Sequence, residues 1–366
     1  MNKLSILVAA GGTGGHLFPA LAVVEALQNI TDNNIEPVFV GNPERLEANI
    51  VPKLGYKFVP LSVVGFSGLF SLKTISLPFK ILQSVSTCKK IIQKNNISAV
   101  LCAGAYLSYP AGLSAVKTNT PLFLMESNVN PGKTIKLLSS KADSIITSFE
   151  KSKTFFNEDE QKKILCFGNP MRNQFDKVQS KAEARQRLKL DPNKKTLFVF
   201  GGSLGALAIN KAVEKYVENV LDDSIQIIWQ TGKNYEYDGP ARDNVVISKF
   251  IDDMATAYYA SDLVVSRSGA TSVSEICLLG KPSILVPLPS ASNNEQAENA
   301  KALVEKNATI MIDNSEILDR FPAEESKLLA NEAEMERMGG IAKTFARPNA
   351  SMDVAKEILE RISNKI

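Results

Sequence analysis

The sequence predicts an α/β protein made of two Rossmann-like domains, each built on a parallel sheet. An apolar strand, a glycine-rich loop and a helix start occur twice, roughly 190 residues apart, at Ser5–Ala9 and at Thr196–Phe200. Alternating strand and helix patterns follow both occurrences, which is typical of βαβ units in a parallel sheet. The length of 366 residues also favours two domains over one.

The composition excludes several classes of protein. A net charge of +3 gives no case for a nucleic-acid partner. The four cysteines are far apart and form no CxxC pair, which is typical of free thiols in a reducing cytosol. Only one histidine is present, so a histidine-rich metal site is excluded.

The first domain is expected over residues 1–165. Helical spacing begins at Leu17, and Pro19 suits the first turn of that helix. Two apolar stretches resemble membrane signals, but Leu4–Ala10 is expected to be a buried strand and Ile97–Val116 a strand, a turn and a short helix. Further strands are predicted at Pro37–Gly41, Ala99–Ala103, Pro121–Met125 and Ser144–Thr147.

The second domain is expected over residues 166–347, because the pattern changes near Asn169 and Pro170. A helix to about Asn219 should follow its glycine loop. A final helix at about 348–366 can pack back on the first domain. Strands are predicted at Thr196–Phe200, Gln226–Gln230, Val245–Ser248, Leu263–Ser266 and Ser283–Val286.

The first glycine loop, Gly11–Gly15, lies between a strand and a helix start. Backbone N–H groups and the positive end of the helix dipole favour an anion at such a place, usually a phosphate. Leu17 stands where a nicotinamide fingerprint needs its third glycine, and Asn42 follows the second strand where that fingerprint needs an acid, so a dehydrogenase is disfavoured. The alternative is a tight turn whose glycines serve packing alone.

His16 follows this loop directly and is the only side chain that ordinarily titrates near neutral pH. Transfer to a hydroxyl group needs an acceptor for the hydroxyl proton, so His16 is a candidate general base. A structural histidine remains the alternative.

The second glycine loop, Gly201–Gly205, is reinforced by the run Arg267–Glu275, which follows a predicted strand and opens a helix. Hydroxyls and amides should converge there, and Glu275 can accept hydrogen bonds from both ribose hydroxyls. The alternative for Glu275 is an acid that merely suits the helix dipole. Glu295 and Gln296 belong to a polar cluster that suits sugar hydroxyls or forms an ordinary loop.

The stretch 48–125 contains no acidic residue and carries +8, so the remainder of the chain carries −5. The apolar runs Val63–Phe70 and Ile75–Phe79 lie within it. A basic rim around apolar side chains favours an anionic bilayer surface, and a solvated basic face is the alternative. Interleaved stacking aromatics or arginines for nucleic acid are missing. The basic residues are Lys53, Lys57, Lys73, Lys80, Lys89, Lys90, Lys94 and Lys117.

Taken in order, these motifs resemble the MurG family of peptidoglycan N-acetylglucosaminyltransferases in glycosyltransferase family 28, over essentially the whole chain. That family has the GT-B fold, two Rossmann-like domains whose parallel sheets face each other across a cleft. The matching motifs are Gly11–His16 with Pro19, Gly104–Pro110, Gly168–Arg172, Gly201–Ala206, Gln230–Lys233, Phe250–Ala255, Arg267–Glu275, and Gln296 with Asn299.

The resemblance implies inverting transfer of N-acetylglucosamine from UDP-N-acetylglucosamine (UDP-GlcNAc) to the 4-hydroxyl of N-acetylmuramic acid in lipid I. Lipid I is undecaprenyl-diphospho-N-acetylmuramoyl-pentapeptide, and the products are lipid II and UDP, in peptidoglycan biosynthesis. The resemblance implies no metal and no other cofactor. It places the protein peripherally on the cytoplasmic face of the inner membrane, with other cell-wall synthesis proteins as further partners.

The resemblance also implies roles for individual residues. His16 would be the base, with Asn128 in the same cleft. The acceptor diphosphate would lie at Gly11, Gly12, Gly14, Gly15, Gly104, Tyr106 and Ser108. UDP-GlcNAc would contact Thr13, Gly14, Gly15, Asn128, Arg172, Ser203, Ile251, Ala270, Thr271, Ser272, Glu275, Glu295 and Gln296.

Two positions depart from the family pattern. Ser127 stands where the family usually has glutamine, and Ala105 where it usually has a second glycine. Both departures lie on the acceptor side, so a related GT-B transferase acting on another lipid acceptor is the nearest alternative. A UDP-GlcNAc 2-epimerase and a non-catalytic nucleotide-sugar binding protein are more distant alternatives.

Overall fold

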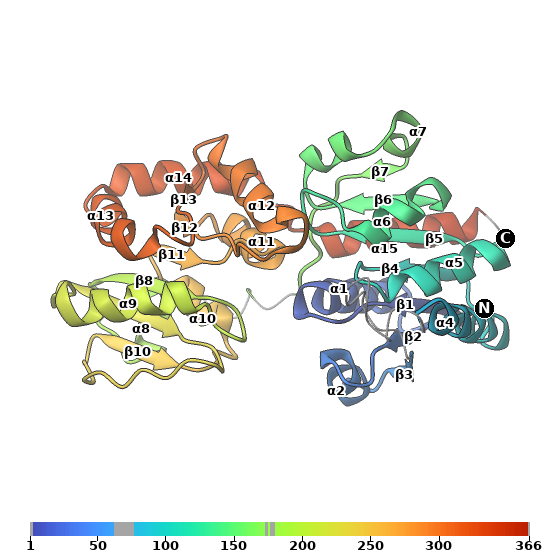
Figure 1. Ribbon diagram of the computed structural model, residues 1–366, viewed down its shortest axis with the longest axis horizontal. Coiled ribbons are helices and arrows are strands. Elements are labelled where there is room, and N and C mark those ends of the chain that lie inside the picture. Colours follow the sequence, from blue (N-terminus) through green and yellow to red (C-terminus); the bar gives the residue numbers. More distant parts are fainter. Residues whose placement is uncertain (1–2, 62–76, 173–174, 176–179, 365–366) are drawn as a thin grey trace. The chain divides into compact units, whose positions relative to one another are not determined.

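The computed structural model describes residues 3–61, 77–172, 175 and 180–364, which divide into two compact units (Figure 1). The N-terminal unit comprises Met1–Arg172 and Arg347–Ile366, and the C-terminal unit comprises Asn173–Ala346. Residues 166–172 thus belong to the N-terminal unit, whereas the sequence placed them in the second domain. The N–H of Gly168 donates to the carbonyl of Thr147 at 3.2 Å, and this bond continues the contacts of the N-terminal sheet into that segment.

The described residues of the N-terminal unit form a seven-stranded parallel sheet in the order β3-β2-β1-β4-β5-β6-β7. Its central strands are mostly apolar because helices cover both faces. The strands are β1 (Leu4–Ala9), β2 (Ile35–Gly41), β3 (Lys57–Pro60), β4 (Ala99–Cys102), β5 (Leu122–Glu126), β6 (Ser144–Thr147) and β7 (Ile164–Leu165).

Side chains of β1 alternate between two hydrophobic clusters, with Ile6 and Val8 on one face of the sheet and Leu7 and Ala9 on the other. The helices of this unit are α1 (Gly14–Ile30), α2 (Leu46–Lys53), α4 (Leu77–Lys94), α5 (Ser108–Thr118), α6 (Lys133–Leu138), α7 (Glu158–Gln161) and α15 (Ala350–Ser363). Short 3₁₀ turns lie at Ser139–Lys141 and Glu150–Phe155.

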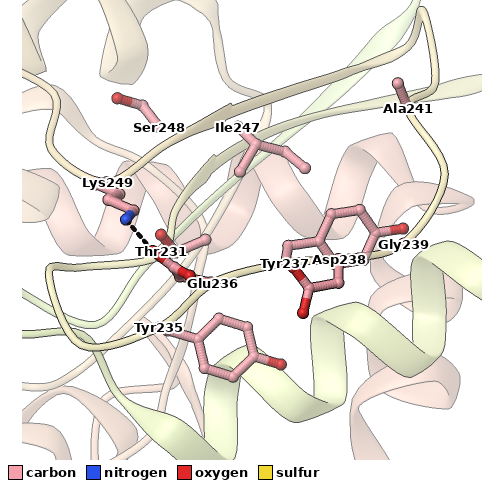
Figure 2. A pocket seen from close by; sticks show the side chains of 10 residues that line it. All are labelled: Thr231, Tyr235, Glu236, Tyr237, Asp238, Gly239, Ala241, Ile247, Ser248 and Lys249. Atoms are coloured by element: carbon pink, nitrogen blue, oxygen red, sulfur yellow. Dashed lines mark hydrogen bonds and ion pairs between the residues drawn. The ribbon is translucent and has the colours of Figure 1, made fainter.

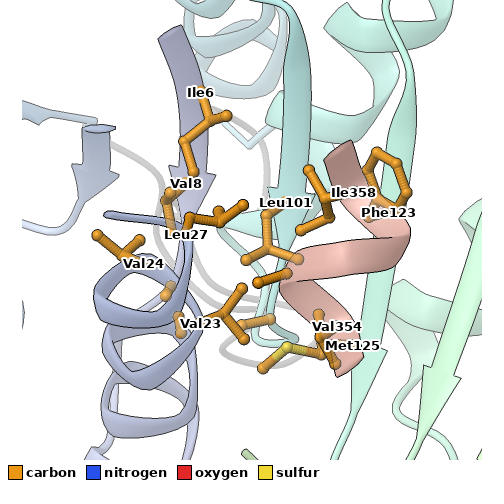
Figure 3. Packing of buried hydrophobic residues seen from close by; sticks show 14 of the residues in the cluster. Ile6, Val8, Val23, Val24, Leu27, Leu101, Phe123, Met125, Val354 and Ile358 are labelled. Carbon is orange, nitrogen blue, oxygen red and sulfur yellow. The ribbon is translucent and has the colours of Figure 1, made fainter. Parts of the chain in front are cut away.

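Helix α15, from the C-terminal end of the chain, packs beside α1 on the first face of the N-terminal sheet (Figure 3). Val354 and Ile358 lie in the same cluster as Leu101 and Phe123 of the sheet. The hydroxyl of Ser144 also donates to a carboxyl oxygen of Glu357 at 2.7 Å. The last helix therefore completes the hydrophobic core of the N-terminal unit.

The described residues of the C-terminal unit form a six-stranded parallel sheet in the order β10-β9-β8-β11-β12-β13. The strands are β8 (Lys195–Phe200), β9 (Ile225–Gln230), β10 (Val245–Ser248), β11 (Leu263–Ser266), β12 (Ser283–Leu285) and β13 (Ile310–Met311). The helices are α8 (Lys181–Arg187), α9 (Leu207–Asn219), α10 (Met254–Ala260), α11 (Ala270–Leu279), α12 (Glu295–Val304), α13 (Ile317–Leu329) and α14 (Glu332–Thr344). A 3₁₀ turn precedes α12 at Ser292–Asn294.

The predicted fold class is confirmed, since both sheets are parallel and carry helices. The apolar stretch Ile97–Val116 forms β4, a turn and most of α5. Of the helices in the described part of the chain, none combines the length and the apolar character that a membrane crossing requires. The run Val63–Phe70 and the start of Ile75–Phe79 lie outside the described residues.

Candidate functional site

Each sheet has one place where the strand order reverses, between β1 and β4 in the N-terminal unit and between β8 and β11 in the C-terminal unit. Ligands of open α/β sheets bind outside the carboxyl ends of the strands at such a switch point. The loops that follow these four strands, together with the starts of the helices after them, contain most of the residues expected to be functional.

The loop after β1 contains the predicted glycines and leads directly into α1. Gly12 has φ +83°, a conformation that favours glycine. Thr13 is extended and precedes the helix, and its side chain does not cap the helix. The N–H groups of Gly14 and Gly15, in the first helical turn, have no intrahelical acceptor. These two amides are therefore available to donate hydrogen bonds to an anion.

Glu47, at the start of α2, is a residue of this site that the sequence did not single out. Its side chain is fully buried. One carboxyl oxygen accepts the N–H of Gly12 at 3.0 Å and the other accepts the N–H of Asn42 at 2.9 Å. The Gly12 amide, which was expected to bind a diphosphate, is thus already hydrogen-bonded to Glu47. The carboxyl group also packs closely on Gly11, where a Cβ would lie 2.3 Å from Glu47 Cδ.

His16 lies in the first turn of α1 and is partly exposed. Its Nδ1 is 3.2 Å from the hydroxyl of Thr13. Burial of the ring lowers the pKa of His16 below its usual range, while a hydrogen bond to the Gly11 backbone and the charge of Glu47 raise it. The lowered pKa favours the neutral imidazole at physiological pH, which is the form that can accept a proton.

The loop after β4 lies against His16. Gly104 has φ +87°, and a Cβ there would lie 2.8 Å from the His16 ring. Tyr106 is partly exposed, and its hydroxyl accepts a hydrogen bond from the Asn42 amide at 3.1 Å. Ser108 is fully buried, and its hydroxyl donates to the carbonyl of Gly104. Ser108 therefore shapes the loop from inside and does not present its hydroxyl to a ligand.

The loop after β5 is organised by the buried carboxyl group of Glu126. It accepts the N–H groups of Asn128 and Gly132, both at 2.8 Å. Asn128 keeps a partly exposed side chain. Ser127, by contrast, is buried and donates to Asn169 at 3.0 Å, so it ties this loop to the segment before Arg172.

Arg172 closes the described N-terminal segment and is paired within its own unit. Its guanidinium group contacts both carboxyl oxygens of Glu25 on α1, at 2.6 and 3.2 Å. Bidentate pairs of this kind fix the planar guanidinium group in place. The structure thus shows Arg172 held by α1.

The glycine loop of the C-terminal unit, after β8, packs backbone against backbone. Gly205 and Gly232 both have positive φ, and a Cβ on Gly205 would lie 2.2 Å from the carbonyl of Thr231. Ser203 is exposed on this loop. Asn210 on α9 is buried, and it binds the Thr231 carbonyl and the Trp229 ring, so its role is to hold the loops together.

Gln230, at the end of β9, connects this loop to Ile251. Its side chain is buried and donates to the carbonyl of Gly202 at 3.3 Å, while its oxygen accepts the N–H of Ile251 at 2.9 Å. The backbone of Ile251, expected at the uracil, is therefore fixed relative to the glycine loop.

The loop after β11 opens α11, whose first turn has no side-chain cap. Its N–H groups and helix dipole therefore point at a place suited to an anion. Ala270 is buried and Ser272 is partly exposed. The hydroxyl oxygen of Thr271 is buried and has no hydrogen-bond partner among the described residues. This hydroxyl is therefore available to donate to an anion at the start of α11.

Glu275, one turn further along α11, is almost fully buried and accepts a hydrogen bond from Tyr258 at 2.9 Å. Burial raises the pKa of Glu275 to about 7, and the hydrogen bond from Tyr258 partly opposes that rise. Tyr258 lies in α10, 17 residues earlier in the chain, and nothing in the sequence pattern pointed to it.

Glu295 and Gln296 begin α12 and are partly exposed. Burial raises the pKa of Glu295. The side-chain oxygen of Gln296 accepts the N–H of Leu288 at 3.0 Å, and its backbone carbonyl accepts the hydroxyl of Ser268. The start of α12 is thereby bound to the loop after β11, so these predicted residues belong to one site.

A pocket of about 430 Å³ lies beside the carboxyl ends of β9 and β10 (Figure 2). The ion pair between Lys249 and Glu236 lies at this pocket, and Tyr235 and Tyr237 also line it. None of the predicted site residues lines it. Within the described residues, no group of three or more His, Cys, Asp or Glu side chains is placed to hold a metal ion.

Two models of a known protein family match the chain. The glycosyltransferase family 28 N-terminal domain matches residues 6–147, and the glycosyltransferase family 28 C-terminal domain matches residues 196–354. A UDP-N-acetylglucosamine–N-acetylmuramyl-(pentapeptide) pyrophosphoryl-undecaprenol N-acetylglucosamine transferase of Christiangramia forsetii is 38% identical over 366 residues, covering 99% of each chain.

Two solved structures resemble the chain at different levels. The crystal structure of Acinetobacter baumannii MurG has a TM-score of 0.75 and 27% identity, covering 98% of this chain and 99% of that one. A putative UDP-N-acetylglucosamine 2-epimerase from Listeria monocytogenes has a TM-score of 0.69 at 15% identity, covering 99% of this chain and 97% of that one, and shows the fold alone. From its sequence, its fold and its full-length relatives, the chain belongs to the MurG family of N-acetylglucosaminyltransferases, within glycosyltransferase family 28.

Proposed function

We propose that this protein transfers N-acetylglucosamine from UDP-GlcNAc to the 4-hydroxyl of N-acetylmuramic acid in lipid I, with inversion at the anomeric carbon. The observation that carries the proposal is the full-length match to relatives whose name states this transfer, in a chain with anion-binding loops at both switch points. UDP and lipid II are the products.

The donor is proposed to bind at the β8–β11 switch point. Glu275 accepts hydrogen bonds from the ribose hydroxyls, and the unpaired hydroxyl of Thr271 donates to the diphosphate together with the first-turn amides of α11. The Ile251 backbone, fixed by Gln230, faces the uracil. Ser203, Ala270 and Ser272 complete the phosphate side, and Glu295 and Gln296 face the sugar.

The acceptor is proposed to bind at the β1–β4 switch point. The Gly14 and Gly15 amides contact its diphosphate, and Tyr106, held by Asn42, lies beside them. His16 takes the proton of the attacking 4-hydroxyl as that oxygen bonds to the anomeric carbon. The bond from this carbon to the β-phosphate oxygen breaks, and donor-site amides stabilise the departing UDP.

Other expected contacts remain part of the proposal. Asn128 lies near the reacting groups, and Thr13 orients His16 through the 3.2 Å contact between them. Arg172 is proposed to contact the nucleotide, which requires its guanidinium group to leave its pair with Glu25.

The protein is also proposed to act peripherally at the cytoplasmic face of the inner membrane, where its lipid acceptor would lie. On α4 an exposed apolar face carries Phe79, which is 76% exposed, and Leu82, which is 60% exposed. Lys89, Lys90 and Lys94 follow on the same helix and are exposed. Apolar insertion with basic neighbours suits an anionic surface.

The proposal is tested by incubating the protein with labelled UDP-GlcNAc and a panel of lipid acceptors, with EDTA present. Label should enter the lipid fraction with a lipid I analogue and not with a diacylglycerol or a polyprenyl phosphate. Donor binding without transfer to the lipid I analogue, but with transfer to another lipid, would instead support a related transferase with a different acceptor.

A further inference from the structure

Glu47 joins the N-terminal glycine loop to the end of β2 through hydrogen bonds. Its two carboxyl oxygens accept the N–H groups of Gly12 and Asn42, at 3.0 and 2.9 Å. The side chain is fully buried. Two acceptor oxygens facing two N–H donors is the arrangement that an ionised carboxyl group satisfies.

Two glycines make room for this carboxyl group. A Cβ on Gly11 would lie 2.3 Å from Glu47 Cδ, and a Cβ on Gly41 would lie 2.5 Å from Glu47 Cγ. Both glycines stand at the carboxyl ends of neighbouring strands, so the side chain occupies the space that a larger residue would fill. The buried carboxyl group of Glu47 therefore explains glycine at these positions, in addition to the binding of an anionic ligand.

The same hydrogen-bond network extends to the loop after β4. The side-chain amide of Asn42, whose backbone N–H is held by Glu47, donates to the Tyr106 hydroxyl at 3.1 Å. One buried carboxyl group therefore connects the carboxyl ends of β1 and β2 directly, and that of β4 through Asn42.

Glu47 also lies against the part of the glycine loop that contacts His16, because a Cβ on Gly11, whose backbone hydrogen-bonds to His16, would lie 2.3 Å from Glu47 Cδ. Uncharged groups against the His16 ring, from the loops after β1 and β4, are the Thr13 hydroxyl, the Gly11 backbone and Gly104. The charge of Glu47 raises the pKa of His16 and opposes the larger effect of burial.

We propose that Glu47 is a positioning residue for the acceptor side of the transfer reaction, holding the glycine loop, Asn42 and Tyr106 in one arrangement and keeping a negative charge beside His16. This inference rests on the proposed function for its kinetic part alone. It also assigns the anion-binding role to the amides of Gly14 and Gly15, because the Gly12 amide is occupied.

The first test is independent of activity. His16 is the only histidine in the chain, so the histidine ring signals in a nuclear magnetic resonance titration report its pKa without assignment. Glu47→Gln should lower that pKa by about half a unit to one unit, because a nearby opposite charge is lost. Glu44→Gln, at an exposed position in the same loop, is the matched control and should leave the titration unchanged.

The second test separates acceptor from donor. Glu47→Gln should lower kcat and raise the acceptor KM, leave the donor KM within about twofold, and shift the acid limb of the kcat profile to lower pH by the same amount as the titration. Glu47→Asp keeps the charge but is too short to reach both amides. It should lower kcat while leaving the His16 pKa close to the wild-type value.

The outcomes distinguish the inference from the proposed function. An unchanged His16 titration in folded Glu47→Gln would overturn the charge role, and unchanged kcat and acceptor KM would overturn the positioning role. Absence of lipid transfer by the wild-type protein would contradict the proposed function, while the titration would still decide the charge role.

If Glu47→Gln does not fold, the Glu47→Asp variant decides the positioning role. A wild-type kcat in Glu47→Asp would contradict that role, and a reduced kcat with a wild-type His16 titration would support it.

Discussion

The donor-binding role proposed for Glu275 would depend on pH. Its carboxyl group is almost fully buried and is contacted by the Tyr258 hydroxyl, and burial raises its pKa to about 7. A protonated carboxyl group keeps only part of its acceptor capacity, so it accepts hydrogen bonds from two ribose hydroxyls less well than a carboxylate does. The form proposed to bind the donor is therefore incompletely populated near neutral pH.

Donor affinity should accordingly rise with pH. The ionised fraction of Glu275 grows as pH passes upward through about 7, so the Kd for UDP-GlcNAc should fall about tenfold between pH 6 and pH 8. The intact diphosphate diester of the donor does not itself titrate in this range. Calorimetric titration of UDP-GlcNAc at both pH values measures the change. Glu275→Gln should bind more weakly at pH 8 and show no such dependence, and an equally steep dependence in that variant would assign the titration to another group.

At the scale of elements, the sequence predicted the buried strands well because parallel strands covered on both faces are continuous apolar runs. Ser144–Thr147 and Leu263–Ser266 agree with the structure residue for residue, and so does Val245–Ser248, although β10 is a partly exposed edge strand. The other three edge strands, β3, β7 and β13, were not predicted. They span only two to four residues and include partly exposed side chains, so they carry no distinctive pattern.

The candidate site was only partly predictable for a related reason. Glycine loops, His16 and the run ending at Glu275 have local signatures, since strand, loop and helix are consecutive. Glu47 contacts Gly12 across 35 residues, and Tyr258 contacts Glu275 across 17. Such hydrogen bonds depend on the packing of separate elements, and no residue spacing in the sequence predicts them.

The loop after β4 contains a strained residue. Ala105 has φ +56°, in the left-handed region that costs a residue with a Cβ roughly 1–2 kcal/mol. Glycine avoids this cost but loses roughly 0.5–1 kcal/mol through the entropy of the unfolded chain. Ala105→Gly should therefore raise the free energy of unfolding by up to about 1 kcal/mol.

Denaturant unfolding measures this effect on stability. Ala241→Gly, at an exposed position without positive φ, is the control and should lower stability. Equal destabilisation by both substitutions would show that the Ala105 conformation is not strained in solution.

At the scale of the whole molecule, the two units carry different chemistry. The stretch 48–125 of the N-terminal unit has a charge of +8 and the rest of the chain −5, while the unpaired Thr271 hydroxyl and Glu275 lie in the C-terminal unit. We propose that the lipid acceptor and the membrane bind to the first unit and the nucleotide to the second.

Membrane binding should depend on α4. Phe79→Ser combined with Leu82→Ser should weaken partition onto phosphatidylglycerol vesicles at least about tenfold, since each exposed apolar side chain loses roughly 1.5–3 kcal/mol of burial in the bilayer. Leu207→Ser combined with Val220→Ser, at exposed apolar positions of the other unit, is the matched control. Vesicle flotation measures the partition, which should weaken with salt and on neutral phosphatidylcholine. Equal binding by both double variants would show that α4 does not contact the membrane.

The assignment of the acceptor to the N-terminal unit and of the donor to the C-terminal unit is best tested by two-substrate kinetics of His16→Ala and Glu275→Ala. The reaction measured is the transfer of labelled N-acetylglucosamine to a lipid I analogue. The account predicts that His16→Ala lowers kcat by about 10²-fold or more with wild-type affinity for UDP-GlcNAc, because the base is lost. It predicts that Glu275→Ala raises the donor KM while leaving the acceptor KM unchanged. Near-normal kcat for His16→Ala at saturating acceptor, together with an unchanged donor KM for Glu275→Ala, would contradict the assignment of both sites.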